Sequence, residues 1–172
     1  MITVRTTSLA GTHAVAAAIA GLARAGDIIV LAGEMGAGKT AFAQGFGAAL
    51  GVVEPITSPT FNLVHSYPLD HVALHHADVY RLSTQHELDD LALDDLADDQ
   101  GIVLVEWGDV VAAAFGEHLT VHLVAPDDDE DVDVDADADG FGLDGSRAIT
   151  ISAVGPSWAA RWSALRAAVC SC

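Results

Sequence analysis

The sequence predicts an α/β fold in which a central, mostly parallel sheet lies between two layers of helices. Two runs, Ile28–Ala32 and residues 102–105, are apolar at every position, which is typical of strands that a parallel sheet buries on both faces. A glycine-rich stretch at 33–40 joins the first run to a segment with helical character. At 172 residues the chain fits one domain with its own core, so we expect a single domain over 1–172.

The glycine-rich stretch reads Gly-Glu-Met-Gly-Ala-Gly-Lys-Thr and matches G-x-x-x-x-G-K-[ST], the phosphate loop, in the strand–loop–helix context that the motif requires. Glycines let successive backbone N–H groups approach a polyphosphate, and the following helix adds its free amides and dipole. Lys39 is the only lysine in the sequence, which makes a chance match to the motif a weak alternative. We expect the nucleotide phosphates to contact Met35, Gly36, Ala37, Gly38, Lys39 and Thr40.

Within this loop, two side chains have distinct expected roles. Lys39 would bridge the β and γ phosphates, and the hydroxyl of Thr40 would take one position on Mg²⁺. Guanine specificity needs an N-K-x-D motif, which a sequence with one lysine cannot supply. The expected ligands are therefore ATP and Mg²⁺.

The first elements follow from local patterns. Residues 2–6 predict a short strand, and the hydroxyls at 6–8 predict the cap of a helix that ends at Gly26. After the phosphate loop, residues 41–50 predict a helix that ends near Gly51.

The middle of the chain predicts a hairpin followed by a helix. A proline-punctuated loop leads into strands at 61–67 and 72–76, with the turn at 68–70. Residues 85–96 then predict one helix with an acidic outer face.

The remaining elements complete the sheet. After the buried strand at 102–105 we expect a short helix at 110–115 and strands at 119–124 and 148–154. Large apolar residues at helical spacing predict a closing helix over 157–169. The expected architecture is a P-loop NTPase-like three-layer sandwich, with antiparallel strands added to the parallel centre.

Nine of the 25 acidic residues lie between Asp127 and Asp139, in a chain with a net charge of −18. We expect residues 127–145 to be a disordered, solvated extension, because this composition offers no core to bury. The spacing does not match an EF-hand, which disfavours a calcium site. An acidic surface repels phosphate backbones, so we expect no tight, unaided binding to nucleic acid.

No apolar run approaches the roughly 18 residues of a membrane span, and the first residues lack a signal-peptide pattern. We therefore expect a soluble, cytoplasmic protein with no membrane partner.

Glu106 is the candidate metal-holding acid. It directly follows the apolar strand at 102–105, and in a doubly wound sheet this strand end lies beside the loop after the first strand. A carboxylate there can hold Mg²⁺ opposite Thr40.

Two further residues are candidates for hydrolysis. Asp78 lies at the end of another predicted strand, and Thr60 could be a switch hydroxyl that meets Mg²⁺ or the attacking water. Without the phosphate loop, each would be interpreted as an ordinary cap or turn residue. His75 and His76 are interpreted as hydrogen-bonded structural groups.

Four segments together resemble the TsaE family, also called YjeE, of small bacterial ATPases in tRNA threonylcarbamoyladenosine synthesis. The phosphate loop is common to many families, whereas the other three segments in this order are specific. The four segments are residues 26–40, which include the phosphate loop, Ser-Pro-Thr-Phe-Asn-Leu-Val at 58–64, His-Ala-Asp-Val-Tyr-Arg-Leu at 76–82 and Val-Glu-Trp at 105–107.

The resemblance implies that residues 58–60 act as a switch, that Asp78 serves hydrolysis, and that Thr40 and Glu106 hold Mg²⁺. It also implies that Trp107 lies near the nucleotide site. Ser146 and Arg147 are implied to come close to the nucleotide, although the acidic extension directly precedes them. Members usually carry leucine where this chain has Met35 and Val79, which are conservative changes.

The resemblance further implies an ATPase with weak or partner-dependent hydrolysis that acts on the TsaB–TsaD heterodimer. Such an acidic ATPase can serve a tRNA enzyme without binding tRNA tightly itself. Two other functions remain open from the sequence. One is a small-molecule kinase, which normally needs more clustered arginines than the six present here. The other is a nucleotide-gated binding module with little turnover.

Overall fold

A computed structural model describes residues 1–59, 62–82, 84–125 and 146–172. Thr60 and the expected extension at 127–145 lie outside the described residues, so their predicted roles stay predictions.

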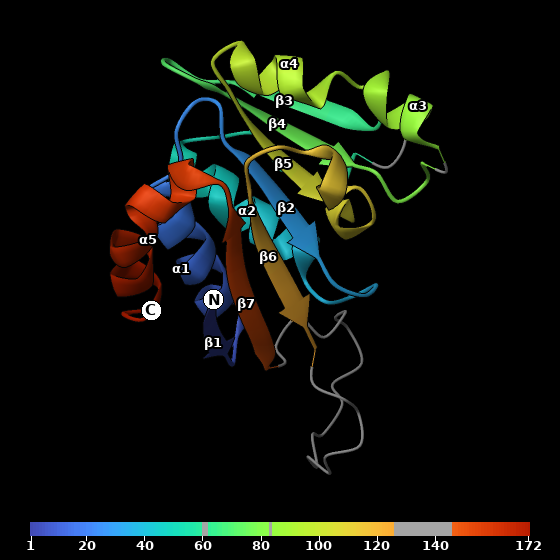
Figure 1. Cartoon of the computed structure of the whole chain (residues 1–172). Helices are drawn as coiled ribbons and strands as arrows, with labels where there is room; N and C mark the ends of the chain where they lie inside the picture. Colours follow the sequence, from blue (N-terminus) through green and yellow to red (C-terminus); the bar gives the residue numbers. More distant parts are fainter. Residues whose placement is uncertain (60–61, 83, 126–145) are drawn as a thin grey trace.

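The described residues form a central seven-stranded sheet with the strand order β1-β7-β6-β2-β5-β4-β3 (Figure 1). Strand β2 pairs in parallel with β5 and β6, and β5 pairs in parallel with β4. The β1–β7, β6–β7 and β3–β4 pairs are antiparallel. The predicted mostly parallel sheet with antiparallel additions is confirmed. The strands are β1 (Ile2–Thr6), β2 (Ile28–Ala32), β3 (Val64–Pro68), β4 (Ala73–Asp78), β5 (Gly101–Glu106), β6 (His118–Val124) and β7 (Arg147–Val154).

Helices cover both faces of this sheet (Figure 1). Helices α1 (Leu9–Ala20), α2 (Lys39–Leu50) and α5 (Pro156–Val169) pack on one face. The short helices α3 (Gln85–Asp89) and α4 (Leu93–Asp98) pack on the other, with the 3₁₀ turns η1 (Gly108–Val110) and η2 (Ala112–Ala114). Each face of the sheet has its own core cluster, the first beneath α1, α2 and α5 and the second beneath α3 and α4. Alternate residues of β2 pack into the two clusters, with Ile29 and Leu31 in the first and Ile28 and Val30 in the second. The three-layer prediction is therefore confirmed.

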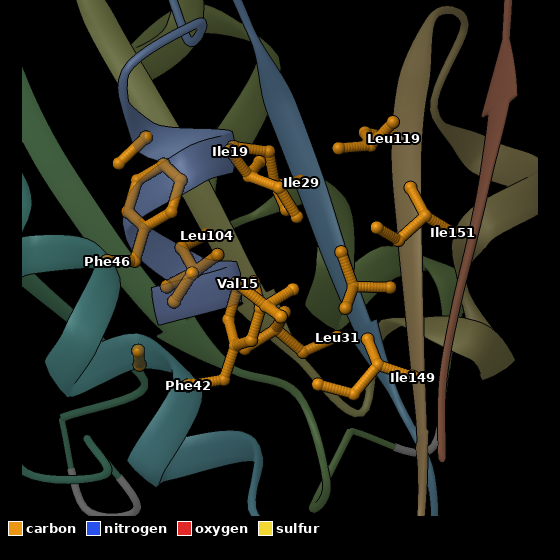
Figure 2. Close-up of a cluster of buried hydrophobic side chains, with 14 of the residues drawn as sticks. Val15, Ile19, Ile29, Leu31, Phe42, Phe46, Leu104, Leu119, Ile149 and Ile151 are labelled. Atoms are coloured by element: carbon orange, nitrogen blue, oxygen red, sulfur yellow. The ribbon is translucent and has the colours of Figure 1, made fainter. Parts of the chain in front are cut away.

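The larger core fixes the position of α2. Phe42 and Phe46 of this helix are fully buried, with ring centroids 6.5 Å apart, and they pack in the same cluster as Ile29 and Leu104 of the sheet (Figure 2). Full burial of such a side chain stabilises the fold by about 1.5–3 kcal/mol. Packing of these rings therefore holds the first turn of α2 at the edge where β2 ends.

The first helix is shorter than predicted. It ends at Ala20, with Gly21 as its C-cap, rather than at Gly26. A turn replaces the last residues of the expected helix. It is closed by the backbone N–H of Arg24, which donates to the Asp27 carboxylate at 2.7 Å. Gly26 lies in this turn with a φ of 90°.

The hairpin strands are shifted from the prediction. Strand β3 begins at Val64 because Leu63 has a φ of 60°, which no extended strand can accommodate. Strand β4 extends to Asp78, where it keeps its pairing with β5. The predicted position of Asp78 at a strand end is confirmed.

Two helix predictions are wrong. The expected single helix at 85–96 is divided into α3 and α4, with Ala92 in a left-handed conformation between them. The expected helix at 110–115 is a pair of 3₁₀ turns, in which Val111, Ala114 and Phe115 each donate to a carbonyl three residues back. This tighter winding accompanies burial of Phe115 in the second core cluster.

Candidate functional site

The phosphate-loop segment leaves β2 through a glycine that no other residue could replace without rearrangement. Gly33 has a φ of 128°, and a Cβ at this position would collide with the carbonyl oxygen of Leu123 in β6. Gly38, with a φ of 102°, caps the N-terminus of α2. The backbone N–H groups of the first turn of α2 lack carbonyl partners within the helix, so this end of the helix is suited to an anion.

The Lys39 side chain folds back onto the loop. Its Nζ donates to the carbonyl oxygens of Gly33 at 2.7 Å and Glu34 at 2.8 Å, and lies 3.5 Å from the centroid of the Trp107 ring. Only 4% of the residue is exposed. Burial lowers the pKa of the Lys39 ammonium, whereas the nearby carboxylates, with Glu106 foremost, act to raise that pKa. A cation is thus held where phosphate oxygens could replace the two carbonyls.

Glu106 lies between the phosphate-loop strand and β4. It is the last residue of β5 and is paired with Leu31 of β2 on one side and Asp78 of β4 on the other. Its Oε2 accepts a hydrogen bond from the Thr40 hydroxyl at 3.2 Å, and its Oε1 contacts His76 Nε2 at 3.0 Å. The strand pairing therefore brings Thr40 and Glu106 together as their sequence positions predict.

Asp78 lies at the same edge of the sheet, and both of its oxygens are engaged. Oδ2 accepts from the Ser58 hydroxyl at 2.6 Å, and Oδ1 accepts from the backbone N–H of Tyr80 at 3.0 Å. Ser58 begins the predicted switch, so the first residue of the switch is tied to the end of β4.

Trp107 follows Glu106 with a φ of 62°, which turns the chain away from the sheet. Its ring contacts Lys39 and packs against Tyr80, with the two aromatic centroids 4.7 Å apart. The tyrosine was not predicted as a site residue. A large aromatic residue two positions after a strand-end acid was the available signal.

Arg147 reaches the loop from β7. Its Nε donates to the Ala37 carbonyl at 3.1 Å, and its Nη1 donates to the Ser146 carbonyl at 2.9 Å. Ser146 thus lies beside Arg147 at the loop. Met35, by contrast, is 75% exposed.

The oxygen atoms of Thr40 and Glu106 are suitable ligands for Mg²⁺. The Thr40 hydroxyl and Glu106 carboxylate are hard oxygen ligands, and Mg²⁺ usually takes one or two protein ligands beside phosphates and water. Among the described residues, no group of three or more His, Cys, Asp or Glu side chains could enclose an ion alone. A metal held jointly with a nucleotide is compatible with this arrangement.

The strand–loop–helix unit and the strand order define an α/β protein of the P-loop type. The chain belongs to the TsaE family, because residues 6–133 match the family described as "Threonylcarbamoyl adenosine biosynthesis protein TsaE". The family named for tRNA threonylcarbamoyladenosine biosynthesis is thus the one that the sequence segments indicate.

Curated relatives and a solved structure agree with this assignment. The TsaE protein of Bacillus subtilis is 40% identical over 107 residues, which cover 62% of this chain and 66% of that protein. The TsaE protein of Streptomyces coelicolor is 46% identical over 94 residues, covering 53% of this chain and 63% of that protein. The matches span slightly less than two thirds of these relatives. The crystal structure of Bacillus subtilis YdiB superposes with a TM-score of 0.71 and 29% identity, covering 99% of this chain and 94% of that one.

No helix in the described part of the chain is long and apolar enough to cross a membrane.

Proposed function

We propose that this protein binds ATP with Mg²⁺ at residues 33–40 and hydrolyses it in support of tRNA threonylcarbamoylation. The supporting observation is the convergence of Lys39, Thr40, Glu106 and Asp78 at one edge of the sheet, around the N-terminus of α2. These are the groups that a nucleoside triphosphatase needs to bind phosphate, hold a metal and position a nucleophile.

Phosphate binding follows from the loop and Lys39. The triphosphate meets the free amides of the first turn of α2, where the helix dipole favours negative charge. Lys39 exchanges the carbonyl oxygens of Gly33 and Glu34 for the β and γ phosphate oxygens.

Thr40 and Glu106 hold Mg²⁺ in this proposal. When bound, Mg²⁺ would neutralise negative charge on the phosphates. The Thr40 hydroxyl donates to Glu106 in the described structure, and it must turn its oxygen lone pair toward the ion when the ion binds. Glu106 keeps its carboxylate within reach, because its backbone is fixed between β2 and β4.

Asp78 serves hydrolysis through its link to Ser58. The 2.6 Å hydrogen bond from the Ser58 hydroxyl to Asp78 ties the start of the switch segment to the end of β4. We propose that the switch responds to the γ phosphate and acts on Asp78 through Ser58, with Thr60 as the switch hydroxyl that meets Mg²⁺ or the attacking water.

The proposed partner is the TsaB–TsaD heterodimer, since the family is named for the pathway in which that complex acts. The net charge of −18 supports binding to a protein partner rather than tight direct binding to tRNA. The proposed location is the cytoplasm.

Lys39→Ala tests the nucleotide site. Loss of the charged hydrogen bonds, worth about 1.5–3 kcal/mol, should weaken ATP binding by roughly 10- to 100-fold in isothermal titration calorimetry. The matched control is Arg5→Ala, which removes one exposed cation on the edge strand β1. Equal ATP affinity in both variants would contradict the proposed site.

Asp78→Ala separates binding from turnover. We expect it to bind ATP but to lose phosphate release in the presence of TsaB and TsaD. Normal tRNA modification by this variant would indicate a nucleotide-gated binding module. Rapid phosphate transfer from ATP to a small molecule by the wild-type protein alone would indicate a kinase.

A further inference from the structure

His76 is a buried polar residue whose partner is the proposed metal-holding acid. It lies in β4, has no exposed surface, and places Nε2 3.0 Å from Glu106 Oε1. Its neighbour two positions before, Leu74, is fully buried and apolar. A polar ring in this strand has a desolvation cost that an aliphatic side chain would not have.

The contact engages only one of the two ring nitrogens, since Nε2 meets Glu106 Oε1. In this contact Nε2 is the nitrogen that can donate to a carboxylate oxygen. His76 Nδ1 is buried and has no hydrogen-bond partner among the described residues. The ring therefore has a hydrogen-bond partner only at the nitrogen that faces Glu106. A function in holding Glu106 explains this arrangement better than a contribution to the stability of β4.

Glu106 is consequently held from two directions. His76 engages Oε1 and the Thr40 hydroxyl engages Oε2, so the plane of the carboxylate is fixed relative to the phosphate loop. Without the imidazole, Glu106 could rotate about its terminal bonds and lose the orientation in which Oε2 faces Thr40.

We propose that His76 is a positioning residue that orients the Glu106 carboxylate toward Mg²⁺. The inference rests on the proposed function, in which Thr40 and Glu106 hold the ion. His76 does not touch the nucleotide or the ion in this role, because its ring is buried behind Glu106. Hydrogen-bond partners of ligating carboxylates orient the metal ligands, and loss of such an outer partner typically weakens metal affinity or activity by about 10- to 100-fold.

The test compares two substitutions of similar size in the full chain. His76→Gln keeps an N–H donor at about the reach of Nε2, whereas His76→Met fills the space without a donor. Binding of ATP is measured by calorimetry across a Mg²⁺ titration and also in excess chelator. Circular dichroism and thermal melting establish that each variant is folded.

For His76→Met we expect the Mg²⁺ concentration at half-maximal enhancement of ATP binding to rise about 10- to 100-fold. The affinity for metal-free ATP should stay within twofold of the wild type, and His76→Gln should recover most of the Mg²⁺ response. If His76→Met is unfolded, His76→Asn replaces it, since its shorter amide cannot reach Glu106.

Three results would overturn the role of His76. The first is an unchanged Mg²⁺ response in the variant that lacks a donor within reach of Glu106, and the second is an equal loss in that variant and in His76→Gln. The third is a parallel loss of metal-free and metal-dependent binding, which a purely structural role would produce. Failure of the wild-type protein itself to bind ATP would instead reject the proposed function, and the role of His76 with it.

Discussion

Arg147 shows how one residue distant in sequence can determine the shape of the phosphate loop. A loop that turns its N–H groups toward an anion must direct carbonyl oxygens elsewhere, and each buried carbonyl needs a partner. The Arg147 guanidinium supplies one for Ala37, and its Nε also lies close to Gly38. Burial of Arg147 beside the loop makes this a fixed contact.

Arg147→Met should therefore destabilise the loop and weaken ATP binding together. Leaving the Ala37 carbonyl without its donor costs about 1–3 kcal/mol, and the loss should appear in urea denaturation. Arg166→Met, on the exposed face of α5, is the matched control and should change stability by less than about 0.5 kcal/mol. Equal stability of both variants would show that the Arg147 contact does not support the loop.

Sequence spacing predicts some members of the site and misses the contacts of others. Lys39 and Thr40 lie within one local motif, so spacing alone places them together. The position of Glu106 follows from its place after an apolar strand. The contact of His76 with Glu106 depends on which strands are neighbours and in what register, with Asp78 opposite Glu106. A local pattern does not contain that information, so the sequence could indicate a hydrogen-bonded histidine but not its partner.

At the scale of elements, the break between α3 and α4 follows from side-chain direction. Leu88 and Leu93 are both buried in the second core cluster. In a continuous helix, residues five positions apart point about 140° away from each other. Ala92, with a φ of 49° and a ψ of 42°, redirects the chain so that both leucines face the sheet. The sequence has no glycine or proline at this point, which is why a single helix was predicted.

Ala92→Gly should stabilise the protein. A left-handed conformation costs a residue with a Cβ about 1–2 kcal/mol, and glycine avoids this cost but loses some chain entropy. We expect a net gain of about 0.5–1 kcal/mol in the free energy of unfolding, measured by urea denaturation. Ala97→Gly, inside α4, is the control and should destabilise by about 1 kcal/mol. A loss of stability in Ala92→Gly would contradict the strained conformation of Ala92.

The strands were predicted more accurately than the helices for a related reason. Runs such as Ile28–Ala32 and Gly101–Glu106 are buried at every position, so one signal covers the whole element. The end of the first helix and the start of β3 depend instead on single turns. Asp27 closes the turn after the first helix by accepting a hydrogen bond from the Arg24 N–H. The positive φ of Leu63 shifts the start of β3 to Val64. Such turns depend on the contacts and backbone angles of single residues, which hydrophobic periodicity does not record.

At the scale of the whole molecule, a buried ion pair joins the last helix to the start of β2. Arg161 of α5 donates from Nη1 and Nη2 to the two carboxylate oxygens of Asp27, each at 2.6 Å. Nη1 also donates to the Leu22 carbonyl at 2.8 Å, and the guanidinium lies 4.0 Å from the centroid of the Trp158 ring. Helix α5 and the residue before β2 thus meet through a pair that leaves little exposed surface on either residue.

Removing both charges should destabilise the protein by less than the sum of the two single substitutions. Arg161→Met leaves a buried carboxylate without its cation, which costs about 3–5 kcal/mol. Asp27→Asn leaves the buried guanidinium without a counterion, but its amide oxygen can still accept from the Arg24 backbone N–H. In the double variant neither charge remains, so the destabilisation should be smaller than the sum of the single effects by about 0.5–3 kcal/mol. Urea denaturation of all four proteins measures this difference. Additive effects would mean that α5 is held to the sheet by the packing of Trp158 and Leu165 rather than by the ion pair.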